Sequence, residues 1–157
     1  AHSYIDNYYH YKFDEIRFNK LNILEIGVST GLSLEMWSEY FPNSYIIGVE
    51  LKKINYRPSN DRIKLITGDG TDSKTFQNIK NLDIVIDDGS HVFTDQIFSY
   101  AILFDKLNKG GIYIIEDVKD IDAVGGFFNR LNVNAKIFDF RKLKNRHDDV
   151  IIEIMKV

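Results

Sequence analysis

The chain has 157 residues, enough for one domain with a proper hydrophobic core, and 44% of them are hydrophobic. It contains no cysteine, which excludes disulfides and thiolate zinc sites. The net charge of −3 and the lack of a broad basic face argue against a nucleic-acid partner. No apolar run approaches the roughly 20 residues that span a bilayer, and no signal-peptide pattern is present. We therefore expect a single cytoplasmic domain over 1–157, with no membrane partner.

Apolar side chains at helical spacing in residues 4–17 predict an N-terminal helical segment within 1–20. Short apolar strands then alternate with longer amphipathic segments. In the helix expected over 31–40, Leu32, Met36 and Trp37 share the predicted inward face. The expected strands are 22–28, 45–50, 62–67, 82–87, 112–116, 135–142 and 150–156. The other expected helices are a short one within 71–79, one over 94–107 capped by Thr94, and one over 120–131.

The last two expected strands are joined only by the polar turn 143–149. So short a turn favours an antiparallel pair, because a parallel crossover needs a dozen or more residues. The preceding alternation of strands and helices predicts an α/β fold with a doubly wound, mostly parallel sheet and one antiparallel strand near the C-terminus. The basic cluster in 141–146 is more typical of a solvated turn than of a phosphate site.

A glycine-containing loop follows the first strand, with the pattern Glu25-x-Gly27-x-Ser29-x-Gly31. Glycine lets the backbone turn tightly and approach a ligand closely. The loop also opens a helix, whose N-terminus favours negative charge. The spacing differs from the dinucleotide-binding GxGxxG, so a plain strand-to-helix turn is the alternative.

Two further acids follow strands of the same half. Glu50 ends the second strand, where a carboxylate can accept hydrogen bonds from a ribose diol. Asp69, in Gly68-Asp69-Gly70, ends the third strand and could read an adenine amino group. The alternatives are a solvated strand-end acid for Glu50 and an ordinary turn for Asp69.

Three more carboxylates follow the next two strands. Asp88 comes after strand 82–87, and Glu116 and Asp117 end strand 112–116. These strands are neighbours in the expected topology, about 4.8 Å apart. Carboxylates this close repel each other, and their pKa values rise unless a cation lies among them. Oxygen ligands favour Mg²⁺ or Mn²⁺, whereas the alternative is one surface acid and one helix cap.

His91 lies three residues after Asp88. Imidazole is the commonest general base in enzymes, so His91 is a candidate for proton removal. The alternative is a packed or helix-capping side chain.

Taken together, these motifs resemble class I S-adenosylmethionine-dependent methyltransferases. More narrowly, they resemble the branch of macrocin-type sugar O-methyltransferases and cephalosporin-hydroxylase-like proteins. The motifs that carry the resemblance are Leu24–Val28 with Gly31, Gly68-Asp69, Ile86–His91, Ile115–Asp117, and the opening His2-Ser3-Tyr4 with Tyr8. The resemblance implies a doubly wound, Rossmann-like methyltransferase sheet.

The resemblance also implies roles for individual residues. S-adenosylmethionine is expected at the cofactor site, Mg²⁺ (or Mn²⁺) at Asp88, Glu116 and Asp117, and His91 as the base. The residues expected to bind the cofactor are Glu25, Gly27, Ser29, Gly31, Glu50, Asp69 and Asp87.

The implied function is a metal-assisted O-methyl transfer to a hydroxyl of a small molecule or sugar. A vicinal diol or catechol-like acceptor could chelate the cation and become more acidic. Only residues 1–20 precede the first expected strand, so we expect an acceptor pocket that is open, completed by another subunit as in a homo-oligomer, or missing from this stretch of sequence. The alternative function is a non-catalytic or partner-dependent cofactor-binding module with a methyltransferase fold. A hydroxylase role ranks last, because the motifs offer no two-His-one-carboxylate iron set.

Overall fold

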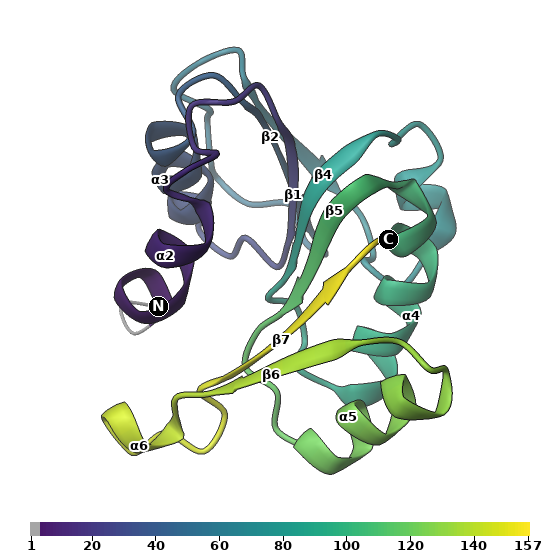
Figure 1. Ribbon diagram of the computed structural model, residues 1–157. Helices are drawn as coiled ribbons and strands as arrows, with labels where there is room; N and C mark the ends of the chain where they lie inside the picture. The colour runs from purple at the N-terminus through teal and green to yellow at the C-terminus, as the bar shows by residue number, and fades with distance from the viewer. Residues whose placement is uncertain (1–3) are drawn as a thin grey trace.

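Seven strands form one sheet in the order β3-β2-β1-β4-β5-β7-β6 in the computed structural model, which describes residues 4–157 (Figure 1). The motif residues His2 and Ser3 lie outside the described part. The strands are β1 (Asn22–Ile26), β2 (Tyr45–Glu50), β3 (Ile63–Thr67), β4 (Leu82–Asp87), β5 (Leu107–Ile115), β6 (Ala135–Asp139) and β7 (Val150–Met155). The helices are η1 (Ile5–Tyr9), α2 (His10–Phe13), α3 (Leu32–Tyr40), η2 (Ser73–Phe76), α4 (Phe93–Leu103), η3 (Phe104–Lys106), α5 (Ile121–Arg130) and α6 (Arg141–Lys144).

The predicted topology is confirmed. Strands β1 to β5 run parallel, and β7 is antiparallel to both of its neighbours, β5 and β6. Asp87 at the end of β4 lies opposite Ile26 of β1 and Ile115 of β5. The carboxyl ends of these three strands, with the loops that follow them, therefore meet at one edge of the sheet.

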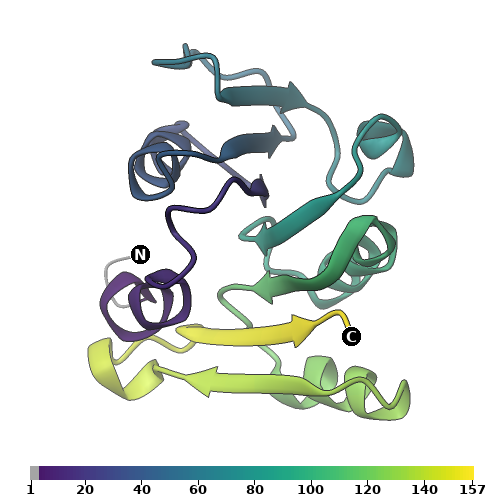
Figure 2. The same ribbon diagram turned by 45° about the horizontal axis from the view of Figure 1, so that its top comes forward.

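Helices cover both faces of the sheet. Figure 2 shows η1, α2 and α3 on one side and α4 and α5 on the other. Strand β4 supplies both layers, because Ile84 and Ile86 pack toward the N-terminal helices and Val85 packs toward α4 and α5. Burial on both faces explains why the central strands read as nearly continuous apolar runs.

Several predicted boundaries and faces were wrong. Leu32 is 73% exposed at the start of α3, and Leu34 is the residue buried in the first turn. Helix α4 starts after Val92 without a side-chain cap, so Thr94 is not its N-cap, and it ends at Leu103 rather than at 107. The expected strand over 135–142 stops at Asp139, where α6 begins after Phe140.

Gly110 and Gly111 lie inside β5 rather than before it. The Gly110 amide donates to the Lys156 carbonyl, and the Lys156 amide donates to the Gly111 carbonyl. Pairing with the chain after β7 thus extends the strand through two residues that have weak strand preference on their own.

The N-terminal helical prediction is confirmed for residues 5–13, as a π-helical turn that continues into α2. Tyr8, Tyr9 and Phe13 are buried there, and the Tyr9 ring meets Trp37 of α3 edge to face at 4.9 Å. In the part of the chain that the structure describes, no helix is both long enough and apolar enough to cross a bilayer.

Candidate cofactor and metal site

A cavity of about 690 Å³ lies at the carboxyl ends of the parallel strands. Loops after all five parallel strands and the start of α4 contribute to it. This is where open α/β sheets bind ligands, outside the strand ends where the strand order reverses. The predicted site residues that line it are Gly27, Ser29, Glu50, Asp69, Asp87, Asp88, His91 and Asp117.

Gly27 brings the loop after β1 against the loop after β4. Its φ is +84°, and a Cβ built on it would lie 2.1 Å from the Asp88 carbonyl oxygen. Only glycine fits this backbone contact without displacement. Gly31 has a φ of +87° and precedes α3 as its N-cap, where a Cβ would meet the Tyr56 ring at 2.5 Å. Gly31 is not part of the cavity lining.

Glu25 lies beneath the glycine loop and is outside the cavity lining. Its carboxylate accepts hydrogen bonds from the Ser33 hydroxyl (2.7 Å) and the Trp37 indole N–H (3.3 Å). Burial raises the pKa of Glu25 to about 7, although these two bonds act in the opposite direction. Glu25 therefore ties β1 to α3 behind the predicted cofactor loop.

Glu50 and Asp69 both line the cavity, and the carboxylate of each already accepts a hydrogen bond from a backbone amide. The Glu50 carboxylate accepts the Ser29 amide at 2.9 Å, which joins the end of β2 to the glycine loop. Asp69 accepts the amide and the hydroxyl of Thr71, and these two bonds lower the pKa of Asp69. Asp69 is thus both a turn residue and a cavity residue.

Asp87 is buried at the floor of the site. It accepts hydrogen bonds from the Gly89 amide (3.3 Å) and the Tyr113 hydroxyl (3.2 Å). Burial nevertheless raises the pKa of Asp87 to about 7.

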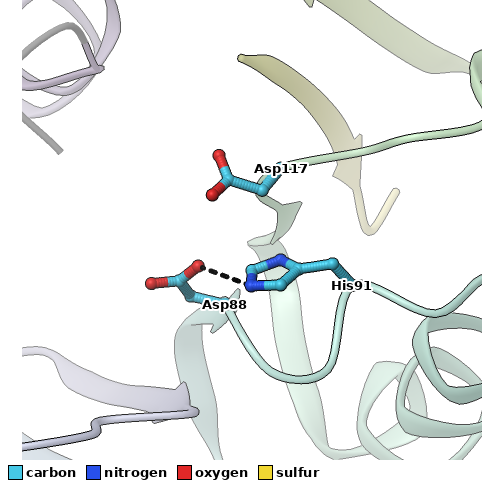
Figure 3. A group of neighbouring side chains, drawn as sticks. All are labelled: Asp88, His91 and Asp117. Atoms are coloured by element: carbon cyan, nitrogen blue, oxygen red, sulfur yellow. Dashed lines mark ion pairs between the residues drawn. The ribbon is translucent and has the colours of Figure 1, made fainter. Parts of the chain in front are cut away.

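Three side chains of the cavity lining converge as a possible cation site. One ligand atom each from Asp88, His91 and Asp117 can be chosen so that all lie within 4.8 Å of one another (Figure 3). The His91 Nε2 lies 3.9 Å from an Asp88 carboxylate oxygen. His91 and Asp117 both adopt left-handed backbone, with φ of +56° and +49°, a conformation that is costly for residues with side chains.

The electrostatics of this group suit a cation. Burial, followed by the negative charge of Asp117, raises the pKa of Asp88 to about 7. Asp88 and Asp117 supply carboxylate oxygens, the donors that Mg²⁺ and Mn²⁺ prefer, and a divalent ion would relieve the repulsion between them. The residues present therefore fit the predicted ion.

Glu116, the third predicted metal ligand, is not among the three residues whose ligand atoms converge. Its carboxylate accepts a hydrogen bond from the Tyr9 hydroxyl, and it is outside the cavity lining. Burial and the charge of Asp88 raise the pKa of Glu116 well above the usual range. Glu116 thus interacts electrostatically with Asp88. The residue whose ligand atom converges with those of Asp88 and Asp117 is His91.

Two residues of this region had no predicted role at the site. Tyr4 donates a 2.6 Å hydrogen bond to Asp117, and burial followed by this bond raises the pKa of Tyr4, so the phenol stays protonated. Arg146, from the basic turn, lies 3.7 Å from the other Asp117 oxygen. Tyr4 belongs to the motif that carried the resemblance, but no sequence spacing connects either residue to Asp117.

Known methyltransferases are similar to this chain in sequence. The FtsJ-like methyltransferase family matches residues 7–142. Mycinamicin VI 2''-O-methyltransferase of Micromonospora griseorubida is 35% identical over 122 residues, covering 71% of this chain and 30% of that protein. Demethylmacrocin O-methyltransferase of Streptomyces fradiae is 32% identical over 122 residues, covering 71% and 31%. The chain spans about a third of the length of these relatives.

A solved structure extends the likeness over the fold. The MycE methyltransferase from the mycinamycin biosynthetic pathway, in complex with Mg and SAH, superposes with a TM-score of 0.75 at 26% identity. The match covers 94% of this chain and 48% of that one. These likenesses confirm the resemblance to macrocin-type sugar O-methyltransferases. With more than half of its length matched by the family, the chain belongs to the FtsJ-like methyltransferases.

Proposed function

We propose that this protein is an S-adenosylmethionine-dependent O-methyltransferase, assisted by Mg²⁺ or Mn²⁺, that acts on a hydroxyl of a sugar or other small molecule. One observation carries the proposal: a single cavity is lined both by Gly27, Glu50 and Asp69 and by the Asp88–His91–Asp117 group. The relatives named as sugar O-methyltransferases, and the MycE structure with Mg and SAH, support it.

The bound groups would supply an electrophilic methyl group and a Lewis acid that makes a coordinated hydroxyl more acidic. The chain's own residues bind and orient. Glu50, already fixed by the Ser29 amide, would accept hydrogen bonds from the ribose diol. Asp88 and Asp117, together with the neighbouring Glu116, would hold the cation. Positioning the acceptor hydroxyl against the methyl group is then the main task of the protein.

His91 would remove the acceptor proton. Its side chain lines the cavity, with Nε2 3.9 Å from an Asp88 carboxylate oxygen, so it lies where an acceptor hydroxyl beside the cation would be. A vicinal diol is the preferred acceptor, because two adjacent hydroxyls can approach one cation together. The cytoplasmic location and the possible homo-oligomer stay predictions.

A crossed binding experiment tests the proposal. Calorimetry with S-adenosylhomocysteine should show binding that Glu50→Gln weakens about 10–100-fold, since a charge-assisted hydrogen bond is lost. Asp88→Asn should leave nucleotide binding intact and weaken Mn²⁺ binding instead. If neither S-adenosylhomocysteine nor S-adenosylmethionine binds at millimolar concentration while NAD does, the cofactor assignment is wrong.

Turnover then separates catalysis from the alternative of a non-catalytic module. A panel of diol-bearing sugars and catechols should include a methyl acceptor, and His91→Ala should slow its methylation about 10²–10⁴-fold with nucleotide affinity unchanged. Binding of cofactor and metal without turnover on any acceptor would favour the non-catalytic module.

A further inference from the structure

The N-terminal segment Tyr4–Phe13 is fastened to the sheet by three tyrosine hydroxyls. All three rings are nearly fully buried, with at most 3% of each residue exposed. Each hydroxyl donates to a carboxylate more than 100 positions away in the sequence. The pairs are Tyr4 with Asp117 at 2.6 Å, Tyr8 with Glu153 at 2.6 Å, and Tyr9 with Glu116.

Two of these bonds end on the consecutive acids of the candidate cation site. Glu116 and Asp117 follow β5, and at Asp117 the chain adopts left-handed backbone. The Asp117 carboxylate contacts two side chains far from it in the sequence, the Tyr4 hydroxyl at 2.6 Å and the Arg146 guanidinium at 3.7 Å. A hydroxyl donor on one carboxylate oxygen restricts rotation of the group. The other Asp117 oxygen lies 3.7 Å from the Arg146 guanidinium and is the one that would bind the cation.

We propose that the N-terminal segment is part of the cation site, with the Tyr4 hydroxyl as a positioning group that fixes Asp117. In the same way, the hydrogen bond from the Tyr9 hydroxyl fixes the Glu116 carboxylate. This inference rests on the proposed function, in which Asp88 and Asp117 hold the ion. Partners that orient metal ligands in this way typically contribute about 10–100-fold to metal affinity.

Tyr8 provides an internal control for a purely structural role. It lies in the same segment, is equally buried and donates the same kind of bond. Its acceptor Glu153 lies on β7, is also paired with Lys12 at 2.8 Å, and is outside the cavity lining. Removing the Tyr8 hydroxyl therefore perturbs the attachment of the segment without touching a candidate ligand.

The test compares Mn²⁺ affinity in Tyr4→Phe and Tyr8→Phe, measured by the electron paramagnetic resonance signal of free Mn²⁺. Both variants should lose roughly 2–6 °C of thermal stability. Tyr4→Phe should weaken Mn²⁺ binding about 10–100-fold. Tyr8→Phe should bind Mn²⁺ as the unmodified chain does, and both should keep their affinity for S-adenosylhomocysteine. Equal Mn²⁺ affinity in the two variants overturns the inference.

A second measurement needs no variant. If the segment is part of the site, Mn²⁺ should slow amide hydrogen exchange in residues 5–13 but not in edge strand β3, and unchanged exchange in the segment overturns the inference. The Asp88→Asn variant distinguishes failure of the proposed metal site from failure of this inference. Mn²⁺ binding that survives Asp88→Asn rejects the metal site itself, and with it this inference. Binding that Asp88→Asn abolishes and Tyr4→Phe spares rejects only the role of Tyr4.

Discussion

Replacing Gly27 by alanine tests whether the contact between the loops after β1 and β4 is as close as the structure indicates. Gly110→Ala is a matched control, because the two glycines have nearly the same φ, +84° and +80°. They differ in the space around them. A Cβ at Gly27 would lie 2.1 Å from the Asp88 carbonyl oxygen and 2.8 Å from the Gly89 Cα, whereas a Cβ at Gly110 would have no atom within 4 Å.

The expected losses of stability follow from the backbone conformation at each glycine and from the space around it. Left-handed backbone costs a residue with a side chain about 1–2 kcal/mol, and this applies to both variants. The clash at Gly27 involves backbone atoms that cannot rotate away, and overpacking of this kind adds about 1–3 kcal/mol. In a domain of this size, that difference lowers the Tm of Gly27→Ala by roughly 2–12 °C relative to Gly110→Ala.

Urea unfolding followed by fluorescence measures the difference, because the single tryptophan, Trp37, is buried in α3 against Tyr9. Calorimetry adds a functional readout. Gly27→Ala displaces the Asp88 backbone and should weaken S-adenosylhomocysteine and Mn²⁺ binding, whereas Gly110→Ala should preserve both. If the two variants lose the same free energy of unfolding and bind equally well, the close approach at Gly27 does not exist in solution.

Two other substitutions test the buried acid behind the site and the attachment of the chain after β7 to η3 and the start of β5. Because burial raises the pKa of Glu25 from 4.5 to about 7, the folded protein holds this proton to a higher pH than the unfolded chain does. The free energy of unfolding of the protein should therefore fall by up to about 3 kcal/mol as pH rises from 4.5 to 7. Glu25→Gln should remove this part of the dependence of the unfolding free energy on pH, measured by urea titrations at several pH values. The Lys156 ammonium donates to the carbonyls of Phe104, Asp105 and Leu107. Lys156→Met should lower the free energy of unfolding by about 1–2 kcal/mol, whereas Lys136→Met, at an exposed lysine of edge strand β6, should change it little.

Local sequence was enough to predict where the site would form. Apolar runs that end in acids or glycines predict parallel strands with polar residues at one edge, and the strand order places the end of β4 beside the end of β5. Asp88 and His91 are three residues apart, so one short loop brings them together. Asp117 joins them because it follows a neighbouring strand, a position that topology alone implies.

The direction of individual side chains was not predictable in the same way. Glu25 belongs to the glycine-loop motif, yet it points at Ser33 and Trp37 because alternation along β1 puts it on the face covered by α3. Glu116 and Asp117 are adjacent in sequence, yet Glu116 is buried against Tyr9 and Asp117 lines the cavity. Whether a side chain points into the core or into the cavity depends on which other residues pack around it.

The amino-acid sequence by itself determined the sheet, its switch point and the group of acids around Asp88. Only the tertiary structure decided that Tyr4 and Tyr9 hold Asp117 and Glu116, across 113 and 107 positions of sequence. Hydrophobic periodicity reports only on the few residues within one strand or helix turn. A hydrogen bond between an N-terminal tyrosine and a strand-end acid exists only once the two layers have packed, so no local pattern can encode it.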